Sequence, residues 1–118
     1  MRVPQFLIAQ GSTPWLELCL PLELTNSTVI YVDICQGRNI VLEYNKNGTT
    51  DLDIKGDGTL SIDEDDATVL ILSMTQGDTL RLIEGETEIQ VRVKTSDGAD
   101  TLIPVWGMTV PAYKGGTI

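Results

Sequence analysis

The segment Val69–Gly98 constrains the fold more than any other part of this chain. It holds two runs in which apolar and polar residues alternate, separated by a short turn-like stretch, MTQGDTLRL. The apolar positions fall on one face of each run: Leu70, Leu72 and Met74 in the first, and Ile89, Val91 and Val93 in the second. A period of two over this length is typical of strands that are buried on one side only. The segment therefore predicts an antiparallel β domain.

The remaining sequence also divides into short strands separated by turn-forming residues. The predicted strands are 5–9, 15–20, 28–35, 39–45, 52–54, 60–62, 67–74, 86–95 and 101–110. Those at 52–54 and 60–62 are expected to form a hairpin around Gly56-Asp57-Gly58, and 76–82 a single helical turn. Seven to nine strands at this spacing predict an all-β fold, an immunoglobulin-like antiparallel β-sandwich, with a small closed barrel as the alternative. Residues 1–112 are predicted to form this single domain, and 113–118 a flexible C-terminal tail.

The strand register also predicts the core and the sheet edges. The residues at the inward parity of the six clearest strands are predicted to be buried: Leu18, Leu20, Ile30, Val32, Ile34, Leu42, Leu70, Leu72, Ile89, Val91 and Val93. Thr75 is predicted to cap the helical turn, and Leu80 to fold back over the core. The uncharged apolar stretch Phe6–Ala9 is expected to pair with another strand, in its own domain or from a neighbouring subunit. The last strand, 101–110, is expected at a sheet edge that Pro104 helps to protect.

Composition excludes several classes of function. The formal net charge is −9, with 8 Lys and Arg against 17 Asp and Glu, which argues against binding to nucleic acid or to anionic membranes. We find no membrane-spanning stretch and expect no signal peptide. The chain contains no histidine, the commonest general base and metal ligand. The sequence therefore predicts a protein that is not an enzyme and has no cofactor and no metal.

Two cysteines, Cys19 and Cys35, lie at outward-facing parity on predicted strands. A chain that stays in the compartment of its synthesis favours free thiols, with a disulfide between neighbouring strands as the alternative.

Two acidic motifs invite a functional interpretation. The segment Asp53–Glu64 imitates a calcium-binding loop, but Lys55 occupies the third ligand position and the flanks alternate as strands. A hairpin without metal explains the segment better. The run Asp63–Asp66 is expected to be a solvated loop.

A candidate interaction surface is predicted from outward-facing aromatic and long polar side chains: Trp15, Tyr31, Gln90, Arg92 and Trp106. Exposed tryptophan and arginine are enriched at protein interfaces. The three aromatic residues of this set are also the only candidates for the binding platform of the alternative function, a ligand- or carbohydrate-binding β-sandwich. An aromatic groove would favour ligand binding, and a flat apolar edge would favour assembly.

Four motifs follow one another along the chain. A turn at Gln10–Trp15 precedes a short strand, and a later strand, Ile30–Gln36, ends in Gln. Met74–Leu80 then matches a Leu-Thr-Gln-x-x-Thr-Leu element, and Ile89–Arg92 matches a Val/Ile-x-Gln-x-Arg strand that is followed by Asp97-Gly98. From Gln10 to about Val110, the chain resembles small prophage-encoded proteins of Firmicutes that are found beside tail and lysis genes. Met74 in place of Leu, and Gly77-Asp78 in place of two acidic or polar residues, depart from the family pattern.

This resemblance implies an immunoglobulin-like phage protein, associated with the tail or baseplate and related to the amino-terminal modules of baseplate proteins. Its expected role is structural, with other phage structural proteins or further copies of itself as partners. The expected locations are the bacterial cytoplasm during assembly and the virion afterwards.

Overall fold

The alternation of apolar and polar residues produces eight strands in the part of the chain described by the computed structural model, residues 3–111. In chain order they are β1 (Leu7–Ala9), β2 (Trp15–Cys19), β3 (Ser27–Gln36), β4 (Asn39–Lys46), β5 (Thr59–Ile62), β6 (Val69–Ser73), β7 (Gly85–Thr95) and β8 (Asp100–Val110), with helix α1 (Gln76–Leu80) between β6 and β7. No helix in residues 3–111 has the length and apolar character needed to span a membrane. The predicted tail at 113–118 lies outside the described residues.

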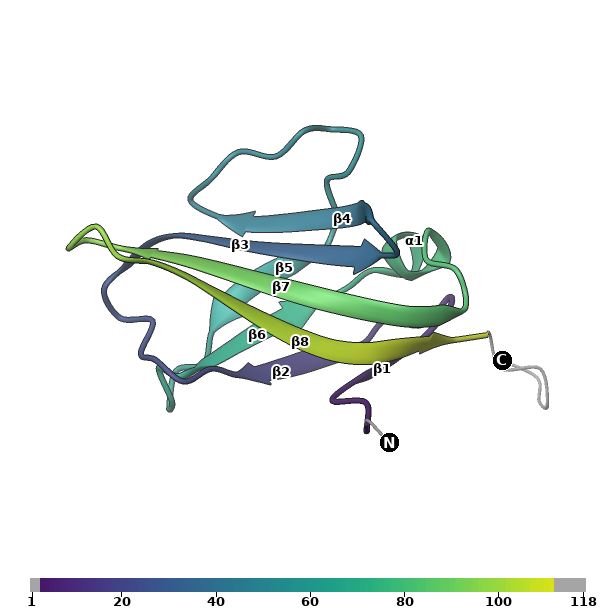
Figure 1. The fold of residues 1–118 in the computed structure, drawn as a ribbon, viewed down its shortest axis with the longest axis horizontal. Coiled ribbons are helices and arrows are strands. Elements are labelled where there is room, and N and C mark those ends of the chain that lie inside the picture. The colour runs from purple at the N-terminus through teal and green to yellow at the C-terminus, as the bar shows by residue number, and fades with distance from the viewer. Residues whose placement is uncertain (1–2, 112–118) are drawn as a thin grey trace.

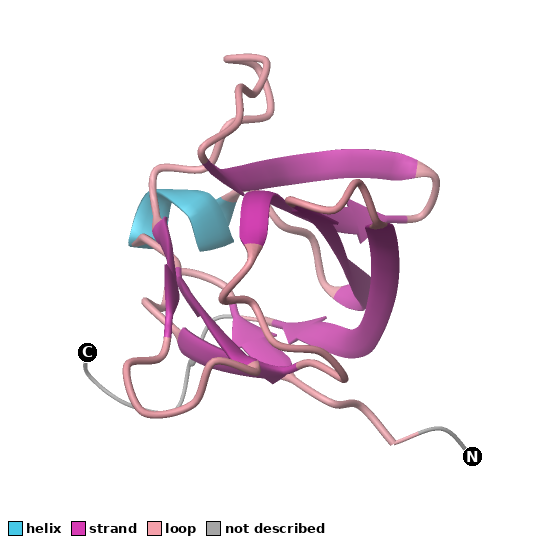
Figure 2. Ribbon diagram, turned by 90° about the vertical axis from the view of Figure 1, so that its left-hand side faces the viewer, coloured by secondary structure: helices cyan, strands magenta, loops and turns pink. Residues whose placement is uncertain are grey.

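The strands form two facing sheets, as the prediction of a β-sandwich required. The large sheet has the order β1-β8-β7-β3-β4, and the small sheet has the order β2-β6-β5. Figure 1 shows the large sheet crossing in front of the small one, and Figure 2 views the molecule after a quarter turn. The paired strands run antiparallel except β1 and β8, which run parallel with Leu7 opposite Met108. The order matches that of immunoglobulin-like sandwiches, so the fold class is confirmed.

The predicted core is confirmed in full. All eleven residues predicted from parity are buried, and none of them is more than 6% exposed. The expectation for Leu80 is wrong, because this side chain is 62% exposed and Leu82, at 1%, covers the core instead. The five-residue helix ends at its C-cap residue, Arg81, and the next residue, Leu82, is the one that points into the core.

A reciprocal capping box fixes the start of α1, as predicted for Thr75. The amide N of Asp78 donates to Thr75 Oγ1 at 3.2 Å, and the amide N of Thr75 donates to Asp78 Oδ2 at 3.4 Å. The same carboxylate accepts from Tyr44 Oη at 2.7 Å and from the amides of Asp57 and Gly58 at 2.9 Å each. Burial opposes the charge of Asp78, but these hydrogen bonds lower the pKa of its carboxyl. Asp78 thus joins α1 to β4 and to the start of β5.

The predicted hairpin between 52–54 and 60–62 is wrong. Residues 52–54 form turns, and β5 pairs with β6, with Leu60 opposite Leu72. The segment before β5 instead covers the outer edge of β4, where Glu43 N donates to Ile54 O at 2.6 Å and Gly56 N donates to Glu43 O at 3.0 Å. This loop rises above β4 in Figure 1. Covering an edge strand in this way prevents uncontrolled pairing with other chains.

The side chain of Arg81 holds the same loop. Its guanidinium donates to the carbonyl oxygens of Asp53 at 2.6 Å, Lys55 at 3.1 Å and Val41 at 3.3 Å. Both α1 and its C-cap residue therefore fix the loop through contacts that are distant in the sequence.

The opposite edge of the large sheet only partly follows the prediction. The stretch Phe6–Ala9 pairs within its own domain, as one of the two expected outcomes, through β1. The last strand is not an edge over its whole length, because β1 covers its second half. Gln5 N donates to Trp106 O and Met108 N donates to Phe6 O, so the even-numbered backbone groups of β8 face β1. Pro104 shares that parity, and its missing N–H therefore faces the uncovered edge and costs no bond to β7.

Candidate functional site

Four of the five candidate surface residues lie on one face. Tyr31 on β3, Gln90 and Arg92 on β7 and Trp106 on β8 alternate with inward-facing residues, so they belong to the outer face of the large sheet. Trp15 lies on β2 in the small sheet and is 65% exposed. The structure therefore brings four of the predicted residues together and separates the fifth from them.

The strand register arranges the outer face of the large sheet in rows. From β4 to β8 the first row is Asn45, Tyr31, Arg92 and Leu102, the second is Glu43, Asp33, Gln90 and Pro104, and the third holds Cys35, Glu88 and Trp106 from β3 to β8. Tyr31 and Trp106 stand in different rows and on strands that are not neighbours. The three candidate aromatic residues do not form one platform.

Two carboxylates face each other near the centre of this surface. Asp33 on β3 lies directly opposite Glu43 on β4. Asp33 Oδ1 is buried and has no hydrogen-bond partner among the described residues. Burial and the adjacent Glu43 carboxyl raise the pKa of Asp33 to about 7, while Arg92 acts in the opposite direction. The sequence did not reveal this pair because the pairing register of β3 and β4 must be known first.

The nearest cation on this face is already paired. The Arg92 guanidinium donates to Asp100 through Nε to Oδ1 at 3.1 Å and through Nη2 to Oδ2 at 2.7 Å. Gln90 Nε2 donates to Glu88 Oε1 at 2.7 Å. Asp33 thus lacks a hydrogen bond from either of these neighbours.

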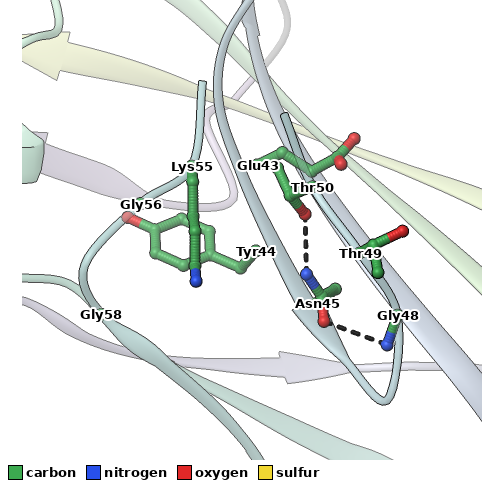
Figure 3. A pocket seen from close by; sticks show the side chains of 9 residues that line it. All are labelled: Glu43, Tyr44, Asn45, Gly48, Thr49, Thr50, Lys55, Gly56 and Gly58. Carbon is green, nitrogen blue, oxygen red and sulfur yellow. Dashed lines mark hydrogen bonds between the residues drawn. The ribbon is translucent and has the colours of Figure 1, made fainter. Parts of the chain in front are cut away.

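Shallow hollows lie on this face or beside it. Depressions of about 270 Å³ and about 410 Å³ both include Asp33 and Arg92 in their lining. A third hollow, of about 330 Å³, lies between β4 and the loop that covers it (Figure 3). There the Asn45 side chain donates to Thr50 Oγ1 at 2.7 Å and accepts from Gly48 N at 3.0 Å. These hollows are open to solvent, unlike an enclosed ligand pocket.

The loop packs on two tyrosine rings through glycines. A Cβ at Gly48 would lie 2.7 Å from Tyr31 Cζ, and a Cβ at Gly56 would lie 2.3 Å from a ring carbon of Tyr44. A larger residue at either position would push the loop away from β4. Tyr31, a candidate contact residue, is therefore partly covered by its own chain.

The cysteines and the acidic motifs show no constellation suited to catalysis. Both thiols are free, and they lie in different sheets, Cys19 on β2 and Cys35 on β3. Burial and then the nearby carboxylates of Asp33 and Glu88 raise the pKa of Cys35, which disfavours the reactive thiolate. The calcium-like segment Asp53–Glu64 is divided between the loop and β5. Within residues 3–111 no group of three or more Cys, Asp or Glu side chains is placed to hold a metal ion.

Comparison with protein-family models and with curated proteins finds no match. Among solved structures, the fold is similar to that of CopC from Methylosinus trichosporium OB3b, with a TM-score of 0.53. The two sequences are 15% identical, and the match covers 91% of this chain and 86% of that chain. At this identity the likeness supports the β-sandwich fold and carries no information about function.

Proposed function

We propose that this chain is a non-enzymatic structural or interaction protein of a phage, associated with the tail or baseplate, that binds a partner protein through the outer face of the large sheet. The observation that carries this proposal is the convergence of Tyr31, Gln90, Arg92 and Trp106 on that face. These residues come from the three neighbouring strands β3, β7 and β8.

The composition of this face suits a protein partner. Leu102 is 60% exposed on β8. Trp106 lies on the same face of this strand, at the alternate position after Pro104. Charged and polar side chains surround these apolar groups. Interfaces commonly combine a few aromatic or arginine anchors with a polar rim.

The phage assignment is supported by the sequence resemblance. The Met74–Leu80 motif includes the capping box and α1, and the Ile89–Arg92 motif occupies the centre of β7. The first motif therefore lies at the connection from the small sheet to the large sheet, and the second lies in the large sheet itself. The alternative, a carbohydrate- or ligand-binding module, lacks a shared aromatic platform on either sheet.

Mass spectrometry of purified particles from an induced lysogen that encodes this chain tests the phage assignment. The proposal expects the protein in the particles at a fixed ratio to the tail proteins. Its absence from intact particles would remove the virion role.

Affinity capture from the same induced cells tests the docking face. We expect Trp106→Ala and Leu102→Ala to lose most of a partner that the wild-type chain retains, because truncated anchors at interfaces cost about 2 kcal/mol or more. Leu52→Ala is a matched control, since Leu52 is 84% exposed but lies in the loop before β5. Equal capture by all three variants would show that the partner binds elsewhere.

A further inference from the structure

The outer face of the small sheet carries negative charge without any described cation. Residues 3–37 and 59–80, which include β2, β5 and β6, contain no lysine or arginine. The same segments place Glu17 and the run Asp63–Asp66 on or beside this sheet. The face that contains Trp15 is therefore of one sign.

A hollow of about 310 Å³ joins Trp15 to the acidic run. Its lining includes Trp15 from β2, Ile71 from β6, Ser61 from β5 and the three residues 63–65. Ile71 lies between the inward-facing Leu70 and Leu72, so its side chain points outward, yet it is only 8% exposed. Ile71 therefore forms an apolar part of the lining of the same hollow as the exposed Trp15.

The acidic side chains of the hollow are not engaged within the protein. Asp66 is bound by its neighbour, with Thr68 Oγ1 donating at 2.6 Å and Thr68 N at 3.0 Å. Asp63, Glu64 and Asp65 make no side-chain hydrogen bond or ion pair with another described residue. The run is thus divided into one residue that shapes the loop and three whose carboxylates remain available.

We propose that this hollow on the small sheet docks a basic segment of a partner protein, with a lysine or arginine side chain lying over the indole of Trp15 and its charge beside the carboxylates at 63–65. A cation over a tryptophan face is attracted by the ring quadrupole. The aliphatic part of such a side chain would pack against the indole of Trp15 and the small exposed part of Ile71. A second copy of this chain is disfavoured as the occupant, because its net charge is −9. The proposal concerns the face opposite to the one assigned above, so either can fail without the other.

The test titrates an acetylated and amidated Arg-Gly-Arg-Gly-Arg peptide into the full chain at low salt. Binding is followed by backbone-amide NMR shifts and by the indole N–H signal of Trp15, with Ala-Gly-Ala-Gly-Ala as the blank peptide. We expect shifts centred on Trp15, Ser61, Ile71 and 63–65. Shifts centred on Asp33 and Glu43, or no shifts, would overturn the proposal.

Two variants separate this site from general acidity. We expect about tenfold weaker binding for Trp15→Ala and for the triple variant Asp63→Asn, Glu64→Gln, Asp65→Asn. The matched control is Glu23→Gln, Asp53→Asn, Glu84→Gln, which removes the same charge from exposed positions elsewhere. An equal loss in this control, or full affinity in Trp15→Ala, would contradict the proposal. Circular dichroism of each variant verifies that it is folded.

Discussion

The two outer faces of this sandwich differ in the signs of their charged side chains. On the large sheet, Arg92 and Lys94 stand among acidic residues, and Arg92 pairs with Asp100 at 2.7 Å. On the small sheet the charged side chains are all acidic. The large sheet therefore carries charges of both signs and pairs Arg92 with Asp100, while Asp33 and Glu43 face each other across β3 and β4. On the small sheet no described cation is available to pair with the acidic side chains, so these side chains can interact with solvent or with a partner.

Both faces rest on the same core. Leu72 on β6 and Leu42 on β4 are fully buried and belong to one continuous apolar cluster between the sheets. A domain with a single core holds its two faces in a fixed relation. A partner on one face would then be positioned rigidly against a partner on the other.

The largest expected effect tests this shared core. Leu72→Ala and Leu42→Ala should each destabilise the whole domain by about 2–5 kcal/mol, the usual range for truncating a buried leucine. Urea denaturation followed by tryptophan fluorescence and by circular dichroism should show one coincident transition for each variant. A variant that loosened only its own sheet, with two separate transitions, would show that the faces are not rigidly coupled.

Asp78→Asn should have the next largest effect and should weaken the small sheet first. Asp78 accepts hydrogen bonds that hold the start of β5, and loss of such charged hydrogen bonds should cost about 2–3 kcal/mol. Hydrogen exchange should speed up in β5 before β3 or β7. Asp57→Asn is the control, because only the backbone of Asp57 takes part in these hydrogen bonds.

The stability from Asp78 also has a defined pH range. Its folded-state pKa is lowered, so its contribution is present above the usual carboxyl value of 3.8 and is lost as the pH falls through the lowered pKa. The wild-type chain should therefore lose stability in acid more steeply than Asp78→Asn. Equal acid sensitivity of the two would contradict the assigned role of this carboxylate.

Local periodicity predicted the parts of this fold that depend on one strand at a time. The core positions and the cap at Thr75 follow from alternation and from capping chemistry, and both are confirmed. The sequence also offered a signal for Asp78 that was missed, since Thr75 followed three residues later by an acidic residue is the pattern of a capping box. The Leu52–Ile54 hairpin failed because the backbone groups of that segment are satisfied by the edge of β4 and by Arg81, which are distant in the sequence.

The sites depend on register and sheet membership, which alternation does not provide. Parity placed Trp15, Tyr31 and Trp106 on outer faces but could not assign them to sheets. To predict that Asp33 lies opposite Glu43, the register between β3 and β4 must be known. To predict the hollow at Trp15, it must be known that β2 and β5 flank β6. The Asp33–Glu43 pair and the hollow at Trp15 therefore could not be predicted from the sequence alone.

A smaller effect should distinguish the acidic residues of the two faces. Because the pKa of Asp33 is raised from 3.8 to about 7, the folded state holds a proton between these values that the unfolded chain has released. Stability should therefore fall as the pH rises from about 4 to about 7. Asp33→Asn should remove this pH dependence of the free energy of unfolding. It should also raise stability at pH 8 by about 1 kcal/mol, a small gain because solvent screens this half-buried site.

The same substitution on the other face provides the comparison. Asp65 is exposed, so Asp65→Asn should leave the midpoint of urea denaturation at pH 8 unchanged within experimental error. If the two variants behaved alike, the carboxylates of the large sheet would be no more constrained than those of the small sheet.

A still smaller change in stability than that of Asp33→Asn is expected for Arg92→Gln, which removes one cation of the large sheet. The Arg92–Asp100 pair is exposed, with side-chain exposures of 51% and 42%, so the urea midpoint should hardly move. The effect should appear in the titration of Asp33 instead. Arg92 lowers the pKa of Asp33, so its removal should raise that pKa above about 7 and extend the pH range over which stability falls. Carboxyl-carbon NMR measures the shift directly, with Lys94→Gln as the control on the same strand. An unchanged Asp33 titration would show that Asp100 already neutralises Arg92, so that the charge balance of this face is made in separate pairs and does not reach the centre of the sheet.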